Sequence, residues 1–253
     1  MAGIGYGVQL AFSWLTVLPV RGPDTVDRSA AARAIAAAPV TGAALGVGAA
    51  ALLWLLTNAG LTPTIAGLLT VAAHALVTRG MHIDGLSDTF DGLGCYGSPE
   101  RAREVMHSGG AGPFGVAALV VCLGLQALSL GVLAEADRWI AVAVAIFVGR
   151  VAVVIACRRG VPAATDQGFG ALVAGTQTRW SIGLWCAAAL FVAAAAATPV
   201  WYGPLATAVV LALAIPLVRH CARRFGGLNG DVLGATLELT VTALLVAMAA
   251  TTP

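Results

Sequence analysis

The sequence contains no lysine, and only 10% of its 253 residues are charged. Aromatic residues make up 6%, whereas 59% of the residues are hydrophobic and the mean hydropathy is +0.89. A water-soluble core cannot absorb that much apolar surface, so this composition excludes an ordinary soluble enzyme and indicates a membrane protein. The formal net charge of +2 gives no support to nucleic-acid binding.

Paired cysteines are also missing. The five cysteines occur singly, at positions 95, 122, 157, 186 and 221, and none forms a C-x-x-C pair. Four of them lie in or at the edge of apolar runs. We therefore expect the cysteines to pack as small hydrophobic side chains.

Long apolar runs are what the sequence has in abundance. Seven are long enough to cross about 30 Å of hydrocarbon. They cover residues 36–57, 61–79, 112–134, 139–157, 180–199, 203–221 and 231–251. The stretch from Ile4 to Val20 is shorter and lacks a signal-peptide pattern, which predicts a membrane-associated helix, with an eighth span as the alternative. The sequence thus predicts one all-α catalytic domain over residues 1–253, a polytopic integral membrane helical bundle of about seven transmembrane helices.

The arginines predict the orientation of this bundle. Twelve of the 14 arginines lie in connections on one side of the predicted spans, Arg138 lies on the other side, and Arg150 lies inside a span. Because cytoplasmic loops of membrane proteins carry the excess of basic residues, the arginine-rich side is expected to be cytoplasmic. The acidic residues described next fall on the same side, which predicts an active site at the cytoplasmic face of the inner membrane.

The most distinctive stretch is His82-Ile-Asp-Gly-Leu-Ser-Asp-Thr-Phe-Asp-Gly-Leu-Gly94, which places three carboxylates within eight residues. At about 100° per residue in a helix, Asp84, Asp88 and Asp91 fall within an arc of roughly 60°. Carboxylates so close repel one another unless their pKa values rise or they share a cation, so this spacing predicts an oxygen-lined Mg²⁺ or Mn²⁺ site. Gly85, which has no side chain, would let another helix or a phosphate approach the backbone.

Asp231 and Glu238, near the C-terminus, repeat this pattern at a distance of seven residues. They follow a glycine-rich turn and share one helix face. A glutamate two turns inside an apolar span is costly unless it is paired or contacts a cation. We therefore expect Asp231 to approach the acidic motif and Glu238 to have a functional partner.

Three arginines are candidates for binding phosphate. Arg150, inside a span with no acid of its own, is expected to face the bundle interior and to meet the acidic site or a substrate phosphate. Arg158 and Arg159 precede a glycine-containing turn and could form an anion clamp, or could simply mark the cytoplasmic edge of the membrane.

The pattern His82-x-Asp-Gly-Leu-x-Asp-x-x-Asp-Gly-Leu93, together with Asn229-Gly-Asp231-x-x-Gly234-Ala235, closely resembles the cobalamin synthase family, also called adenosylcobinamide-GDP ribazoletransferases. The resemblance covers nearly the whole chain. It includes Phe12-x-x-Leu-Thr-x-Leu-Pro19, Pro39-x-x-Gly42 and Pro113-Phe-Gly115.

This resemblance implies a Mg²⁺-dependent integral membrane enzyme. Its partners would be the lipid bilayer, adenosylcobinamide-GDP and either α-ribazole or α-ribazole 5′-phosphate. The products would be adenosylcobalamin or its 5′-phosphate, with release of GMP. The resemblance does not settle which riboside is used or whether the protein forms a homo-oligomer.

The acidic residues, His82 and the arginines can each be given a role in that reaction. A cation held by Asp84, Asp88 and Asp91, with Asp231 approaching from the last span, would bridge the diphosphate oxygens and stabilise the departing GMP. A ribose hydroxyl would attack the phosphorus, and its proton would pass to His82 or to an aspartate that does not bind the metal. His82 lies about 160° from Asp84 on a helical wheel, off the acidic face. The expected substrate-binding residues are Arg150, Arg158, Arg159, Asn229 and Glu238.

Other functions remain open at this stage. Membrane phosphotransferases acting on CDP-lipids usually show Asp-Gly-x-x-Ala-Arg, whereas this chain has Leu86-Ser-Asp88 after its Asp-Gly. Prenyltransferases carry two aspartate-rich repeats, but here the second would supply only Asp231 and Glu238. A transporter would place acids near the membrane midplane and not at one rim.

Overall fold

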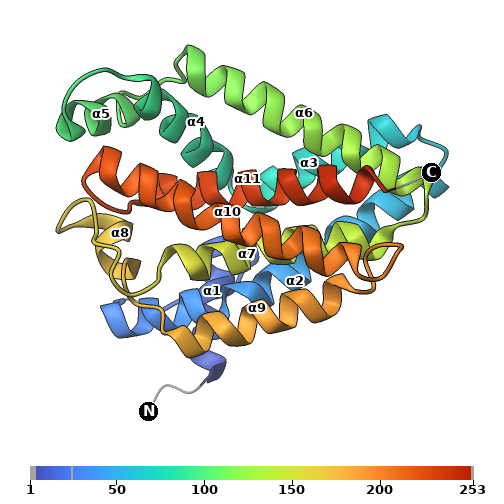
Figure 1. Ribbon diagram of the computed structural model, residues 1–253, viewed down its shortest axis with the longest axis horizontal. Helices are drawn as coiled ribbons and strands as arrows, with labels where there is room; N and C mark the ends of the chain where they lie inside the picture. The colour runs from blue at the N-terminus through green and yellow to red at the C-terminus, as the bar shows by residue number, and fades with distance from the viewer. Residues whose placement is uncertain (1–3, 24, 252–253) are drawn as a thin grey trace.

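The computed structural model describes residues 4–23 and 25–251, in which every regular element is a helix. In chain order these are α1 (Ile4–Leu15), α2 (Arg28–Asn58), α3 (Pro63–Val77), α4 (Met81–Gly94), α5 (Pro99–Met106), α6 (Pro113–Glu135), α7 (Trp139–Ala156), α8 (Gly168–Val173), α9 (Arg179–Ala193), α10 (Tyr202–Phe225) and α11 (Gly230–Ala249). The long helices run roughly side by side (Figure 1). The predicted all-α membrane bundle is confirmed.

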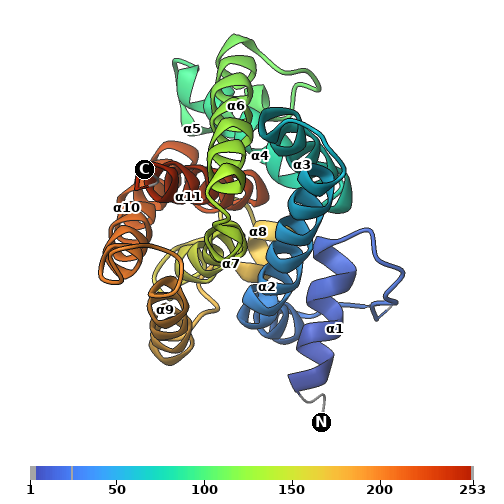
Figure 2. The ribbon, with the colours of Figure 1, turned by 90° about the vertical axis from the view of Figure 1, so that its right-hand side faces the viewer.

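Two helices, α7 and α11, lie toward the middle of the bundle, and the others surround them (Figure 2). Every residue of α7 from Val144 to Ala156 is buried. Apart from Arg150, this helix is apolar on all sides, as expected for a helix in such a central position. The surrounding helices instead expose large apolar side chains such as Leu76 and Phe191, which suits contact with lipid.

Fewer helices than the predicted number of about seven are long and apolar enough by themselves to cross a membrane. Within the described residues five helices are long and apolar enough to cross a membrane, namely α2, α6, α7, α10 and α11, and the bent pair of α3 and α4 makes a sixth if it is counted as one span. The run 180–199 forms only the 15-residue α9, which is about 22 Å long at 1.5 Å per residue. Apolar residues continue past Ala193, where this helix ends, so the apolar run is longer than the helix.

The run 61–79 forms α3 and ends within two residues of the predicted position, where the chain turns through 93° between α3 and α4. Arg79 and Gly80 both adopt left-handed backbone conformations, with φ of 58° and 68°. Such a conformation stops a right-handed helix. α4 is 14 residues long, about 21 Å at 1.5 Å per residue, and is too short to span a bilayer alone.

The helices α4 and α11 cross at two glycines. A Cβ atom at Gly85 would lie 2.8 Å from the carbonyl oxygen of Asp231, and one at Gly234 would lie 3.1 Å from the Cα atom of His82. Only glycine permits such close backbones. The close approach expected at Gly85 is therefore confirmed, and the neighbour is helix α11. This crossing places Asp231 beside the acidic motif.

The end of the bundle with α4, α5 and α8 (Figure 1) is held together by arginines. Arg28 donates hydrogen bonds to the carbonyl groups of Ala171 and Ala174 in and just after α8. Arg103 of α5 donates to the carbonyl oxygen of Phe225 at 2.6 Å, where α10 ends. The last carbonyl groups of a helix have no partner within the helix, and these side chains supply one.

The short N-terminal helix α1 packs on α2. Leu10 of α1 is buried in a small cluster with Ala30 and Ala34 of α2. Because α1 has 12 residues, about 18 Å at 1.5 Å per residue, it is too short to span the membrane, as expected for a membrane-associated helix.

Candidate active site

Two cavities share Asp84 and Met81 as lining residues, and this shared region is called the junction below. The first has a volume of about 660 Å³ and is bordered by α4 and by the loop that follows α5. Its polar lining residues are Arg79, Asp84, Ser87, Asp88 and His107. The second has a volume of about 420 Å³ and lies among α1, α2, α4, α7, α8 and α11. Its lining residues are Trp14, Leu15, Ile35, Ala38, Met81, His82, Asp84, Arg150, Val153, Phe169, Gly230, Asp231, Leu233 and Gly234.

Three of the predicted acids gather at this junction. Asp84 and Asp88 line the first cavity, and Asp84 and Asp231 line the second. Burial, followed by the negative charges of Asp84 and Asp231, raises the pKa of Asp88 to about 6. The charges of these carboxylates therefore oppose one another, and a cation or a substrate with bound cation would relieve that repulsion.

The third acid of the motif, Asp91, is engaged elsewhere. Its carboxylate accepts hydrogen bonds from the backbone N–H groups of Gly112 at 2.7 Å and Gly115 at 2.9 Å. These two groups lie at the start of α6, where the helix dipole also favours a negative charge. The geometry supports a structural role for Asp91, which fixes α6 against α4, and its predicted metal binding stays a prediction.

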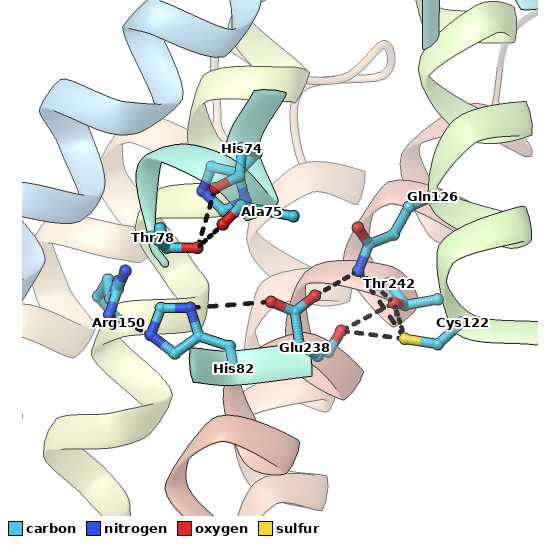
Figure 3. A network of polar contacts seen from close by, with 9 residues as sticks. All are labelled: His74, Ala75, Thr78, His82, Cys122, Gln126, Arg150, Glu238 and Thr242. Atoms are coloured by element: carbon cyan, nitrogen blue, oxygen red, sulfur yellow. Dashed lines mark hydrogen bonds and ion pairs between the residues drawn. The ribbon is translucent and has the colours of Figure 1, made fainter. Parts of the chain in front are cut away.

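Arg150 faces the interior of the bundle, as expected. Its side chain is 2% exposed and reaches the second cavity, which Asp84 and Asp231 also line. The absence of a side chain on Gly42 makes room for it, because a Cβ atom there would lie 2.6 Å from the Cγ atom of Arg150. One guanidinium nitrogen, Nη1, donates to Nε2 of His82 at 2.9 Å, whereas Nη2 is buried without a hydrogen-bond partner (Figure 3).

His82 joins Arg150 to a second group of polar residues. Its Nδ1 atom lies 4.0 Å from Oε1 of Glu238, and Oε2 of Glu238 accepts a 2.7 Å hydrogen bond from Gln126 (Figure 3). Gln126 also donates to the hydroxyl of Thr242 at 3.0 Å. This network explains how Glu238 is tolerated inside the last span. Glu238 is 3% exposed and lines neither cavity, so the structure does not bring it to the substrate side.

The same contacts bear on His82 as a proton acceptor. Arginine can only donate, so the Nε2 atom of His82 must be the acceptor of the Arg150 hydrogen bond. This hydrogen bond occupies the lone pair on Nε2 with which His82 would accept a proton. His82 lies off the acidic face, as the helical wheel predicted, and lines only the second cavity.

Asn229 positions an acid of the site. Its side-chain oxygen accepts from the backbone N–H of Val232 at 3.0 Å, which caps α11, and its Nδ2 atom donates to the Asp231 carboxylate at 3.0 Å. An asparagine at this position is a preferred helix cap. The predicted binding residue Asn229 is therefore seen here as the residue that orients Asp231.

Arg158 and Arg159 lie away from both cavities. The Nη1 atom of Arg158 donates to the carbonyl oxygen of Ile155 at 3.2 Å, and the backbone N–H of Arg159 donates to the carbonyl oxygen of Gln177 at 3.1 Å. The structure instead places Arg79 and His107 in the first cavity. The sequence analysis did not single these two residues out as site residues, although a cation directly before the acidic motif was a usable signal.

The acids at the junction fit Mg²⁺ best together with a substrate. Within residues 4–23 and 25–251, no group of three or more His, Cys, Asp or Glu side chains is close enough to hold a metal ion by itself. Magnesium is commonly held by one or two carboxylates together with substrate phosphates and water. Asp84, Asp88 and Asp231 fit this second arrangement, in which the ion binds together with a phosphate-bearing substrate.

Comparison with known proteins gives a consistent result. The sequence model of the family described as "Cobalamin-5-phosphate synthase" matches residues 7–249. A protein from a Nocardioides species is 42% identical over 96% of this chain and 97% of its own length. A protein from Frankia casuarinae is 38% identical over 97% of this chain and 95% of its own length. A protein from Corynebacterium efficiens is 37% identical over 95% of this chain and 90% of its own length. All three carry the name adenosylcobinamide-GDP ribazoletransferase. No solved structure matches the chain.

Proposed function

The chain belongs to the cobalamin-5-phosphate synthase family, and on this premise we propose that it is an adenosylcobinamide-GDP ribazoletransferase. It joins adenosylcobinamide-GDP to α-ribazole or α-ribazole 5′-phosphate and releases GMP, at the end of cobalamin synthesis. The observation that carries this proposal is the meeting of two cavities at Asp84, with Asp88 and Asp231 beside it. A transfer between two substrates needs such a junction.

In this proposal Asp84, Asp88 and Asp231 would hold Mg²⁺ when the donor is bound, and Asp91 is retained as a candidate ligand. When bound, the ion supplies positive charge that stabilises the phosphate oxygens and the departing GMP. Asn229 keeps the Asp231 carboxylate oriented through its 3.0 Å hydrogen bond. The chain itself thus fixes the acids before substrate arrives, which reduces the cost of assembling the site.

The cations around the junction neutralise the phosphate charge. Arg79 and His107 border the first cavity, and Arg150 borders the second. Such groups stabilise the charge that develops on phosphate oxygens during transfer. Arg158 and Arg159, which lie outside both cavities, keep a role only in drawing an anionic substrate toward this end of the bundle.

The transfer step itself forms one bond and breaks one. A ribose hydroxyl oxygen of the acceptor attacks the phosphorus attached to the cobinamide arm, and the bond from that phosphorus to the bridging oxygen of GMP breaks. The hydroxyl proton passes to a carboxylate of the junction that does not bind the ion. His82 is the alternative acceptor and would first have to release its hydrogen bond from Arg150.

We further propose that the junction faces the cytoplasm, in the inner membrane. The support is the distribution of the arginines, twelve of which lie in connections on one side of the predicted spans. The soluble nucleotide product GMP would then be released into the cytosol. Inside-out and right-side-out vesicles distinguish the two orientations, because externally added substrates should react only in inside-out vesicles.

A direct test uses the purified protein in nanodiscs with adenosylcobinamide-GDP, α-ribazole and Mg²⁺, and measures released GMP. Asp84→Asn should lower the rate by about 100-fold or more, because the remaining carboxylates cannot hold the ion in position. Asp166→Asn, an exposed loop acid outside both cavities, is the matched control and should keep the wild-type rate. Absence of GMP release by the wild-type protein would contradict the proposed function.

A further inference from the structure

We infer that the second cavity is the binding site of the acceptor, an aromatic nucleoside, and that Trp14 and Phe169 form the wall on which its base stacks. This inference rests on the proposed function, which supplies the acceptor, and it adds which of the two cavities takes it. Three independent features of the cavity carry the argument.

The first feature is an aromatic wall. Trp14 of α1 and Phe169 of α8 both line the cavity, with ring centroids 5.3 Å apart and planes inclined by 67°. Both residues are half-buried, so part of each ring stays open. The neighbouring lining residues, among them Leu15 and Ile35, are apolar. A planar base is the kind of group that packs against such a wall of aromatic side chains, because every base has a π face.

The second feature is an unused donor in the same cavity. Arg150 is 2% exposed, and its Nη2 atom is buried without a hydrogen-bond partner although the residue lines the cavity. A buried N–H group without an acceptor is unfavourable, and such groups are rare in folded proteins. An oxygen of the ligand, either a ribose hydroxyl or a 5′-phosphate, would satisfy it. A nucleoside carries such oxygens next to its aromatic base.

The third feature is the size and connection of the cavity. Its volume of about 420 Å³ is at the lower end of the range of about 300–1,000 Å³ for small-molecule sites, whereas the other cavity measures about 660 Å³. The larger cavity, bordered by Arg79 and the loop after α5, suits the diphosphate of the bulkier donor. Both cavities include Asp84, so a ribose hydroxyl in the smaller one would face the phosphorus across that carboxylate.

The test measures the two substrates separately. Trp14→Leu and Phe169→Leu should each raise KM for α-ribazole by about tenfold or more, because each removes one stacking surface, and should leave KM for adenosylcobinamide-GDP unchanged. Trp14→Phe keeps an aromatic ring and should stay near the wild-type KM for α-ribazole. Trp180→Leu, at an 89% exposed tryptophan at the start of α9, is the matched control and should change neither KM.

Calorimetric binding of α-ribazole to the same proteins in nanodiscs, without donor, separates this inference from the proposed function. If the wild-type protein releases no GMP, the proposed function fails, and the calorimetry alone tests the aromatic site. The site is supported if α-ribazole binds the wild-type protein, binds Trp14→Leu more weakly and still binds Trp14→Phe. An unchanged KM for α-ribazole in both leucine variants would overturn the inference. So would an equal rise of both KM values, or α-ribazole binding that is absent or insensitive to these substitutions. Phe169→Leu, on a different helix, repeats the test if Trp14→Leu does not fold.

Discussion

The crossing of α4 and α11 at Gly85 gives the most quantitative prediction. In Gly85→Ala the new Cβ atom would lie 2.8 Å from the carbonyl oxygen and 2.9 Å from the Cα atom of Asp231. Ordinary contacts of a Cβ atom begin at 3.4 Å, so α4 and α11 must separate by roughly half an ångström or more. Backbone atoms cannot rotate away as a flexible side chain can. Overpacking of this kind costs about 1–3 kcal/mol.

A glycine-to-alanine change also favours the helix itself by about 1 kcal/mol, which would partly hide the clash. Gly124→Ala in α6 is the matched control, because a Cβ atom there meets nothing within 4 Å and the helix gains the same propensity. The difference between the two variants therefore isolates the clash. At about 2–4 °C per kcal/mol, Gly85→Ala should melt about 2–12 °C below Gly124→Ala.

The same displacement should affect catalysis, because it moves Asp84 and Asp231 apart. A misplacement near 1 Å can cost about 100-fold in rate, so Gly85→Ala should release GMP roughly 10- to 100-fold more slowly than Gly124→Ala. Melting is followed in detergent with the purified proteins, and GMP release in nanodiscs. Equal melting temperatures and equal rates for the two variants would show that the α4–α11 contact does not organise the site.

Three further predictions concern polar contacts. Asp91→Asn should lower stability by about 1–2 kcal/mol in a thermal melt, because an amide cannot accept from both N–H groups at the start of α6; an unchanged melt would refute the capping role. Gln126→Leu should destabilise the protein by about 1–3 kcal/mol, because it removes the 2.7 Å hydrogen bond to the buried Glu238; wild-type stability would mean that Glu238 has another partner. Ser98→Ala removes the cap of α5 and should increase amide hydrogen exchange in that helix, at a cost of about 0.5–2 kcal/mol; exchange equal to wild type would argue against the cap.

Local patterns were good predictors of local structure. The spacing of the acidic motif predicted a helix with Asp84 and Asp88 on one face, and both line the first cavity of the folded protein. The lone arginine in an apolar run, Arg150, was correctly expected in the interior. Each of these inferences depends on neighbours within about two helical turns, where geometry follows directly from the sequence.

Contacts between distant segments were not predictable in this way. The carboxylate of Asp91 turns to the N-terminus of α6, 21 and 24 residues further along the chain, and not to the cavity that Asp84 and Asp88 line. The predicted run ends at 79, next to Gly80, but the 93° turn that directs α4 across the bundle was not predicted from the sequence. The cavity with Trp14 and Phe169 combines α1 and α8, whose packing on α2 only the fold shows.

The most direct test of the account is metal binding at the junction of the two cavities. Mn²⁺ serves as a spectroscopic substitute for Mg²⁺, and its binding to the purified protein with adenosylcobinamide-GDP is measured by electron paramagnetic resonance. We expect one bound ion in the wild-type protein and in Asp166→Asn, and binding weakened by about tenfold or more in Asp84→Asn, since a direct carboxylate ligand is lost. Equal Mn²⁺ affinity in wild-type protein and Asp84→Asn would contradict the claim that these aspartates hold the ion against the diphosphate.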